Sequence, residues 1–237
     1  MRTIGLIGGM SWESTALYYK LINEGVRDRL GSLRSGSIIL WSFDFEPIKL
    51  LQQTGEWEEA GERLADAAVR LEAAGADVVV LCTNTMHKVA AAIEARLHIP
   101  FLHLADATAA RIVHAGLRRV GLLGTRFTME QDFYISRLRA HGLDVLTPLP
   151  DERDDVHRII YDELCAGIVS ASSREIYRRI VAGLAERGAE AVILGCTEIT
   201  LLIGPQDVSI PTFDTTAIHA EAAVAFAVAG ETFRPEQ

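Results

Sequence analysis

The sequence of 237 residues is poor in cysteine and in lysine. Its three cysteines, Cys82, Cys165 and Cys196, are too few and too widely spaced for a disulfide framework or for a zinc site built from paired cysteines. None of its three lysines lies in the glycine- and serine-rich surroundings expected around a lysine that binds pyridoxal phosphate. The seven histidines form no cluster with the helical spacing of metal ligands. We therefore expect no metal site and no cofactor.

Basic residues are also in deficit, because 23 Lys and Arg stand against 32 Asp and Glu and leave a net charge of −9. A nucleic-acid partner requires a basic surface, so we expect none. No apolar run approaches the roughly 20 residues of a membrane-spanning helix, and the first residues lack the basic stretch of a secretion signal. With 49% hydrophobic residues, the chain is expected to be a globular, cytoplasmic protein without a membrane partner.

Short apolar runs alternate with helical patterns along the chain. In the first half, the expected strands are residues 3–9, 37–43, 77–81 and 99–104, and the expected helices are residues 16–29, 57–73 and 85–96. This alternation is typical of a parallel sheet with helices on both faces. The sequence therefore predicts an α/β fold.

The second half of the chain repeats the first. Residues 120–125 resemble the opening strand and its turn, and residues 188–194 resemble residues 75–81. A cysteine and a threonine follow shortly in each case, at Cys82 and Cys196. A duplicated pattern of this kind predicts two similar folding units.

We expect two domains related by pseudo-twofold symmetry, each a parallel sheet flanked by helices. The first domain is predicted to comprise residues 1–112, joined by the C-terminal helix 217–228, and the second to comprise residues 113–216. Open α/β sheets bind ligands at the carboxyl ends of their strands. Two such edges that face each other would place the active site in the cleft between the domains.

Cys82 and Cys196 are the main candidates for chemistry, because both are expected at this carboxyl edge. A single buried cysteine is usually a small hydrophobic residue. Packing alone does not explain a thiol at the same element boundary in both halves. Each thiol precedes a predicted helix, whose dipole is expected to lower the thiol pKa and to allow proton exchange near neutral pH.

The residues next to the two cysteines are rich in hydroxyl and amide groups, namely Thr83, Asn84, Thr85 and Thr197. Together with free backbone N–H groups at a helix start, such side chains suit a carboxylate, so an acidic small molecule is the expected ligand. Helix capping is the alternative explanation. Thr125 follows the repeated turn and is a further candidate donor to the cleft.

Four other features have weaker interpretations. Gln52 is expected in a polar loop that either contacts the substrate side chain or is solvated. Cys165 is expected to pack within a helix, and His87 either orients a group near Cys82 or is a surface residue. The glycines of residues 5–10 have the spacing G-x-x-G-G, which does not match a dinucleotide-binding turn.

Five motifs together resemble the aspartate/glutamate racemase family: residues 1–14, 81–87, 124–133, 195–199 and 213–220. The resemblance spans nearly the whole chain and is nearest to the bacterial broad-specificity amino-acid racemases. It implies a cofactor-independent, homodimeric enzyme that racemises an amino acid. By this resemblance, Cys82 and Cys196 flank the substrate α-carbon and exchange its proton in a two-base mechanism.

The same resemblance implies a set of substrate-binding residues: Met10, Gln52, Thr83, Asn84, Thr85, Thr125, Thr197 and Glu198. The chain departs from the family members that are specific for aspartate, which use an Arg and a Lys to hold the side-chain carboxylate. In those neighbourhoods this sequence has Gln52 or Gln53 and Cys165. Strict aspartate specificity is therefore not expected. Related reactions stay open, namely those of maleate isomerase, hydantoin racemase and arylmalonate decarboxylase, as does a non-catalytic protein that binds small acids.

Overall fold

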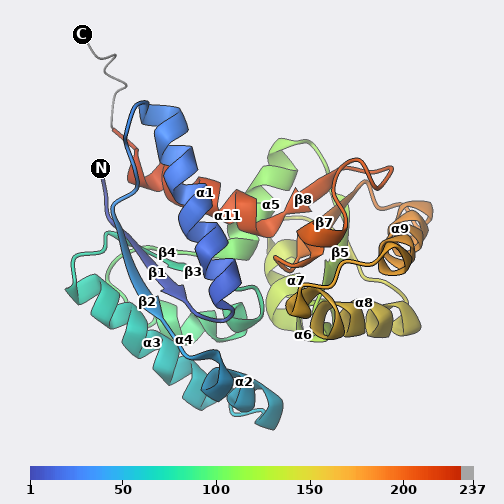
Figure 1. Ribbon diagram of the computed structural model, residues 1–237, viewed down its shortest axis with the longest axis horizontal. Coiled ribbons are helices and arrows are strands. Elements are labelled where there is room, and N and C mark those ends of the chain that lie inside the picture. Colours follow the sequence, from blue (N-terminus) through green and yellow to red (C-terminus); the bar gives the residue numbers. More distant parts are fainter. Residues whose placement is uncertain (231–237) are drawn as a thin grey trace. The chain divides into compact units, whose positions relative to one another are not determined.

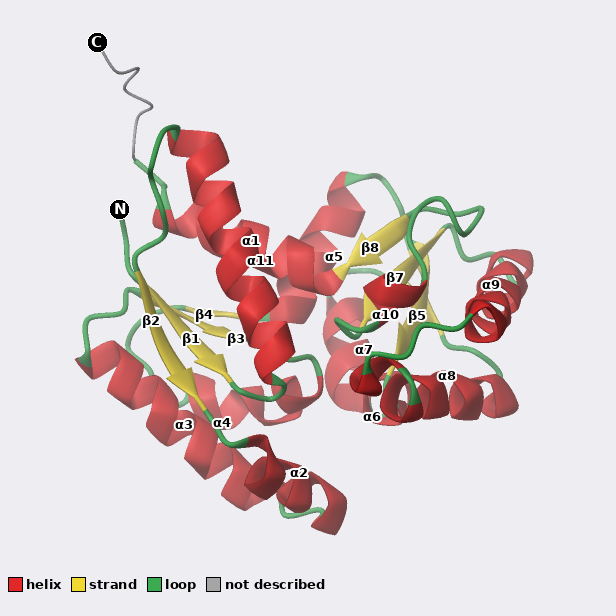
Figure 2. Ribbon diagram, in the orientation of Figure 1, coloured by secondary structure: helices red, strands yellow, loops and turns green. Residues whose placement is uncertain are grey.

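The computed structural model describes residues 1–230. The chain divides into two units, each of which is described by itself: unit 1 is Met1–His103 with the chain from His219 onward, and unit 2 is Leu104–Ile218. Each unit contains a four-stranded parallel sheet with helices on both faces (Figures 1 and 2). The predicted α/β fold with two similar parallel sheets is confirmed.

The sheet of unit 1 has the strand order β2-β1-β3-β4. Its strands are β1 (Ile4–Gly8), β2 (Ile38–Ser42), β3 (Val78–Leu81) and β4 (Phe101–Leu102). Its helical elements are α1 (Trp12–Leu30), α2 (Phe45–Thr54), α3 (Trp57–Ala73), η1 (Thr85–Val89), α4 (Ala90–Glu94) and the larger part of α11 (Thr215–Ala227). The two central strands are buried along their length, as expected for a sheet that is covered on both faces.

Two apolar layers enclose this sheet. On one face of the sheet, α1 and α11 pack against β1 and β3 through Tyr18 and Val224. On the other face, α3 packs through Leu64 and Leu71 against Ile7 and its neighbours. Side chains alternate between the two faces along a strand, so consecutive residues of β1 serve different layers.

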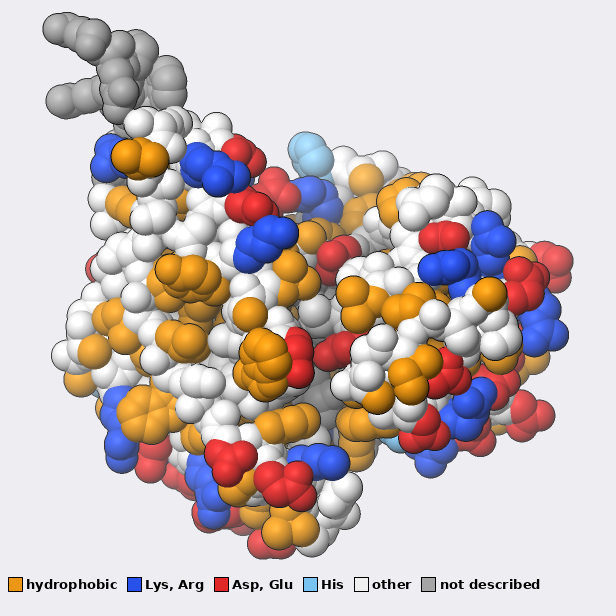
Figure 3. Space-filling model, viewed as in Figure 1, with side chains coloured by type: hydrophobic (Ala, Val, Ile, Leu, Met, Phe, Trp, Pro, Cys, Tyr) orange, Lys and Arg blue, Asp and Glu red, His pale blue; other side chains and the backbone are white. Residues whose placement is uncertain are grey.

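The sheet of unit 2 has the corresponding order β6-β5-β7-β8. Its strands are β5 (Arg119–Gly124), β6 (Asp144–Leu146), β7 (Ala191–Gly195) and β8 (Thr212–Asp214). Its helical elements are α5 (Leu104–His114), α6 (Arg126–Glu130), α7 (Asp132–Ala140), α8 (Pro150–Asp162), η2 (Leu164–Ala166), α9 (Ala171–Glu186) and α10 (Ile199–Leu202). Basic and acidic side chains are interspersed on the face of this unit that Figure 3 shows.

The observed division of the chain differs from the expected boundary at residue 112. Helix α5 belongs to unit 2, because Ala109 and Ile112 pack with β5 residues such as Leu122 in one apolar cluster. The chain returns to unit 1 within α11, at His219, where the sequence pattern had placed the start of the returning helix at residue 217. Helix α11 continues from unit 2 into unit 1, so no break in the helical pattern of the sequence marks this boundary.

His219 connects three elements of unit 1 and is fully buried. Its Nε2 lies 2.8 Å from the carbonyl oxygen of Leu102 in β4, and its Nδ1 lies 2.9 Å from the hydroxyl of Tyr18 in α1. A carbonyl only accepts, so Nε2 carries the proton and Nδ1 accepts from Tyr18. Burial lowers the pKa of His219 to about 4. The side chain is therefore neutral at physiological pH.

This burial makes folding stability dependent on pH. The unfolded chain binds a proton at His219 near pH 6.5, whereas the folded protein binds it only near pH 4, so stability falls as the pH drops through this window. The difference corresponds to about 3 kcal/mol at the acidic end. Urea unfolding between pH 7 and pH 4.5 should show a weaker pH dependence in His219→Gln. The exposed His114→Gln is the control and should keep the wild-type slope; an unchanged slope in His219→Gln would contradict this assignment.

Candidate active site

Cys82 directly follows β3 and is fully buried. Its backbone N–H donates to the carbonyl of Ile7 in β1 at 2.9 Å. Its carbonyl accepts from the hydroxyl of Ser14, in the first turn of α1, at 3.2 Å. The main chain of Cys82 is thus held from both sides, by the neighbouring strand and by the first helix.

The turn after β1 brings Met10 to the same edge of the sheet. Thr15 holds this turn, because its hydroxyl accepts from the backbone N–H of Gly9 at 2.8 Å. Gly9 has a φ of 87°, and a Cβ there would lie 2.2 Å from the carbonyl oxygen of Phe43. Only glycine fits such a position. Met10, which follows, is 5% exposed and packs in the apolar cluster of this unit.

Gln52 lies in helix α2 and is buried, so the expected polar loop at this position is wrong. Asp44 caps the helix by accepting from the backbone N–H of Glu46, and Ile48 and Leu51 form its buried face. The side-chain amide of Gln52 donates to the sulfur of Met86 in η1 at 2.9 Å. This contact connects α2 to the segment that follows Cys82.

The segment between Cys82 and η1 is a tight turn. The backbone N–H of Thr83 donates to the carbonyl of Leu81 at 2.9 Å, and Asn84 and Thr85 are both buried. The side chain of Asn84 does not cap η1, which removes the capping explanation for this residue. Met10, Gln52 and this turn follow three different strands, so they gather at the carboxyl edge of the sheet of unit 1.

Cys196 occupies the corresponding position in unit 2, directly after β7. It is partly buried, and its thiol donates to Oε2 of Glu198 at 2.8 Å. The hydroxyl of Thr197 lies 3.0 Å from the hydroxyl of Thr216, at the start of α11. The carbonyl of Thr197 accepts from the hydroxyl of Thr200 at 2.8 Å.

Thr125 follows β5, the strand that pairs with β7 up to the residue before Cys196. It caps α6: its hydroxyl accepts from the backbone N–H of Thr128 and lies 3.2 Å from the Thr128 hydroxyl. Thr125, Thr197, Glu198 and Cys196 therefore form a second group at the carboxyl edge of the sheet of unit 2.

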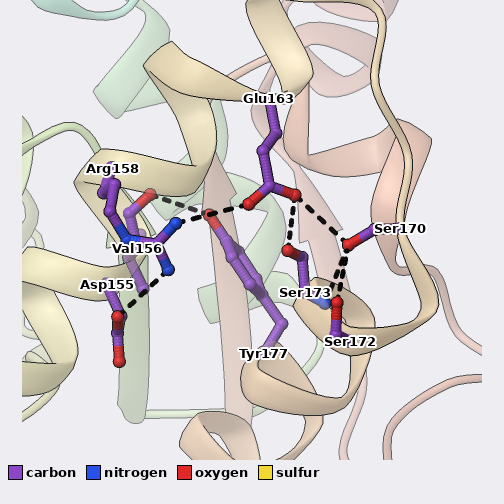
Figure 4. A network of polar contacts seen from close by, with 8 residues as sticks. All are labelled: Asp155, Val156, Arg158, Glu163, Ser170, Ser172, Ser173 and Tyr177. Atoms are coloured by element: carbon purple, nitrogen blue, oxygen red, sulfur yellow. Dashed lines mark hydrogen bonds and ion pairs between the residues drawn. The ribbon is translucent and has the colours of Figure 1, made fainter.

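Cys165 is exposed in η2, so the expected packing within a helix is wrong. Helix α8 ends before it, and Gly167 adopts a left-handed conformation. Glu163 holds this loop, because its carboxylate accepts from Ser173 at 2.5 Å and from Ser170 at 3.2 Å (Figure 4). Figure 4 also shows Arg158, which approaches the same carboxylate from α8.

The pKa values of both candidate thiols are raised, contrary to the expected effect of a helix dipole. Burial raises the pKa of the Cys82 thiol. Burial also raises the pKa of the Cys196 thiol, and the negative charge of Glu198 raises it further. The helical elements after the two cysteines, η1 and α10, comprise only five and four residues. Such short elements offset little of the cost of removing a thiolate from water.

Three polar or sulfur contacts at these edges were not expected from the sequence, and they involve Ser14, Met86 and Thr216. For two of these residues, Ser14 and Thr216, the sequence position could have indicated a polar contact. Ser14 lies in the first turn of the expected helix, and Thr216 follows Asp214, whose carboxylate accepts from the start of α11. Nothing in the sequence pattern pairs Met86 with Gln52.

Within residues 1–230, no three His, Cys, Asp or Glu side chains are grouped so that they could hold a metal ion. No helix in the same part of the chain has the length and the apolar character required to cross a membrane.

Known proteins resemble this chain in sequence and in structure. The broad specificity amino-acid racemase RacX of Bacillus subtilis is 26% identical over 170 residues, which cover 70% of this chain and 72% of RacX. The structure of a candidate Asp/Glu racemase from Yersinia pestis has a TM-score of 0.93 and 55% identity, covering 96% of this chain and 100% of that one. An aspartate racemase homologue from Pyrococcus horikoshii has a TM-score of 0.86 and 37% identity, covering 96% and 99%.

The model of the family of Asp/Glu/hydantoin racemases matches residues 7–223, a range that contains both candidate cysteines and nearly all of the two sheets. The chain therefore belongs to the Asp/Glu/hydantoin racemase family.

Proposed function

We propose that this protein racemises an amino acid without a cofactor, with Cys82 and Cys196 as the two bases. One observation carries the proposal. Each unit places a Cys-Thr pair directly after the third strand of its sheet, in the same strand order. A two-base racemisation uses a proton acceptor on one face of the α-carbon and a proton donor on the other. A duplicated thiol supplies both from one kind of residue.

In the proposed reaction, the thiolate of one cysteine removes the α-proton and becomes a thiol. The electron pair of the broken C–H bond delocalises into the α-carboxylate. The thiol of the other cysteine then gives its proton to the opposite face and becomes a thiolate. Donors aimed at the carboxylate stabilise the developing charge. We assign this task to Thr83, Asn84 and Thr85 in unit 1 and to Thr125 and Thr197 in unit 2.

Glu198 gives the second half a proton acceptor that the first half lacks at the corresponding position. It accepts the hydrogen bond of the Cys196 thiol, whereas the corresponding position in the first half, two residues after Cys82, is Asn84. A carboxylate can take up a thiol proton, and a neutral amide cannot. We propose that Cys196 is a thiol in the free protein and that Glu198 accepts its proton once substrate is bound, so that Cys196 acts as the thiolate while Cys82 remains a thiol.

The residues that would contact the substrate side chain are uncharged on unit 1. Met10, Gln52 and Met86 are buried there, and the amide of Gln52 contacts the Met86 sulfur. We propose that this surface accepts more than one amino-acid side chain, in line with the name of the similar RacX protein.

The function is tested by incubating each of the common L-amino acids, and its D-enantiomer, with the purified protein and following both enantiomers by chiral chromatography. At least one pair should interconvert to an equal mixture, without added metal or pyridoxal phosphate. The double variant Cys82→Ala, Cys196→Ala is the control and should be inactive. Turnover of maleate, a hydantoin or an arylmalonate, with no amino acid racemised, would overturn the proposal in favour of a related reaction.

A further inference from the structure

Three histidines form a buried cluster in unit 1, next to the segment that follows Cys82. His87, His103 and His219 are 2%, 4% and 0% exposed. The ring centroid of His87 lies 4.5 Å from that of His103 and 5.8 Å from that of His219. The ring of Phe101 lies 5.8 Å from that of His87. His87 is therefore not a surface residue.

A short side-chain hydrogen bond connects the cluster to the Cys82 turn. Nδ1 of His87 lies 2.7 Å from the carbonyl oxygen of Thr83, the residue after Cys82. Because a carbonyl only accepts, Nδ1 carries the proton and donates it. The backbone N–H of His87 also donates to the carbonyl of Asn84 at 3.1 Å. His87 thus holds the turn of Thr83 and Asn84 from both its ring and its main chain.

The duplication supplies an internal comparison. In unit 2, the carbonyl after the cysteine is that of Thr197, and it accepts from the hydroxyl of Thr200 at 2.8 Å. In both halves, the carbonyl of the residue after the cysteine therefore accepts a hydrogen bond from a side chain of the following turn. The donor is an imidazole in unit 1 and a hydroxyl in unit 2. A threonine hydroxyl is sufficient for the hydrogen bond. The imidazole in unit 1 adds a rigid ring that packs against two further histidines.

We propose that His87 is a positioning residue for Cys82: its Nδ1–H fixes the carbonyl of Thr83, and the packed rings of His103 and His219 fix His87. This inference rests on the proposed function, because His87 can orient a reacting thiol only if Cys82 takes part in the reaction. His87 itself need not touch the substrate.

The surroundings of the cluster support this role. His103 is the last residue of unit 1 before the chain passes into unit 2, and His219 is the first residue after it returns. His219 donates to the carbonyl of Leu102, so it ties the returning chain to the departing one. The Cys82 turn is therefore braced by the two segments of unit 1 through which the chain enters and leaves it.

Two amide variants test the hydrogen bond without removing polarity. The amide nitrogen of His87→Asn falls near the position of Nδ1 and keeps the donor to Thr83, whereas that of His87→Gln falls near Nε2 and loses it. We expect His87→Gln to lower kcat at least tenfold with KM within threefold of wild type, and His87→Asn to retain kcat within threefold. Thr200→Val is the matched control, because it removes the side-chain donor to the corresponding carbonyl in unit 2 and leaves only the longer bond from the Thr200 backbone N–H, at 3.3 Å.

A second readout does not depend on racemisation. In a Cys165→Ser background, the rates at which iodoacetamide alkylates Cys82 and Cys196 are measured by mass spectrometry of their peptides. His87→Gln should change the rate at Cys82 at least fivefold and leave that at Cys196 within twofold, Thr200→Val should do the reverse, and His87→Asn should change neither. If no amino acid is racemised, this labelling pattern still tests the positioning.

Equal effects of His87→Asn and His87→Gln, or equal changes at the two cysteines in a protein with an unaltered circular dichroism spectrum, would overturn the inference. If His87→Gln does not fold, His87→Asn is compared with the wild type alone. A wild-type rate of Cys82 alkylation in His87→Asn supports the role of the donor, and an alkylation rate raised fivefold or more overturns it.

Discussion

Cys82→Ser and Cys196→Ser should each lower kcat/KM for racemisation about 10³-fold, because general acid–base catalysis by one positioned group contributes roughly 10²- to 10⁴-fold. A serine hydroxyl holds its proton far more tightly than a thiol, so neither the removal nor the return of the α-proton is supported on that face. The equilibrium constant of racemisation is one. The loss of kcat/KM must therefore be equal from the L- and from the D-enantiomer.

The control for these variants is Cys165→Ser, which removes the exposed third thiol. It should retain kcat/KM within about threefold, since the proposed reaction uses Cys165 neither as acid nor as base. A near wild-type rate in either Cys82→Ser or Cys196→Ser would rule out the two-base assignment, whatever the rate of the control.

Glu198→Gln should lower kcat/KM about 10²-fold at neutral pH, again equally in both directions. The glutamine keeps the size of the side chain but cannot accept the thiol proton that Glu198 Oε2 faces at 2.8 Å. We expect the loss to shrink as the pH rises, because solvent hydroxide then takes over the deprotonation. The matched control is Glu175→Gln on α9, which alters an exposed carboxylate outside the site.

The raised thiol pKa values set the direction of the pH profile where no carboxylate takes the thiol proton. The proposed reaction needs one thiolate, and burial raises the pKa of both thiols above the ordinary value. In Glu198→Gln, which must lose that proton to solvent, the thiolate fraction and kcat/KM should therefore rise from pH 7 toward pH 9, whereas the wild-type protein should have a flatter profile. A Glu198→Gln variant with wild-type rates across this range would show that the carboxylate does not take the proton.

The repeated sequence pattern was sufficient to predict the two sheets and the equivalent positions of the two cysteines. Residues 75–81 and 188–194 are similar enough to indicate a common strand, and a strand followed by Cys-Thr places the thiol at the carboxyl edge by geometry alone. The division into units was harder to predict, because the chain changes unit directly before α5, which packs with unit 2, and again inside α11, which continues from unit 2 into unit 1.

The environment of individual side chains was the least predictable part of the site. Gln52 lies among polar neighbours in sequence, yet the apolar face of α2 carries it into the protein. His87 and Cys82 are buried and Cys196 is partly buried, and desolvation is the largest cause of the raised pKa of both thiols. A local pattern, such as a cysteine before a helix, does not show how deeply the thiol is buried, and so it does not predict the cost of removing a thiolate from water.

The most direct measurement is racemisation of a single enantiomer in deuterated water, followed over less than a tenth of the reaction. Two separate bases predict that the newly formed enantiomer carries deuterium at the α-carbon, while the remaining starting enantiomer keeps its original proton. Substantial deuterium in the unreacted substrate, or a product that retains the original proton, would indicate one base that serves both faces and would contradict the two-thiol account.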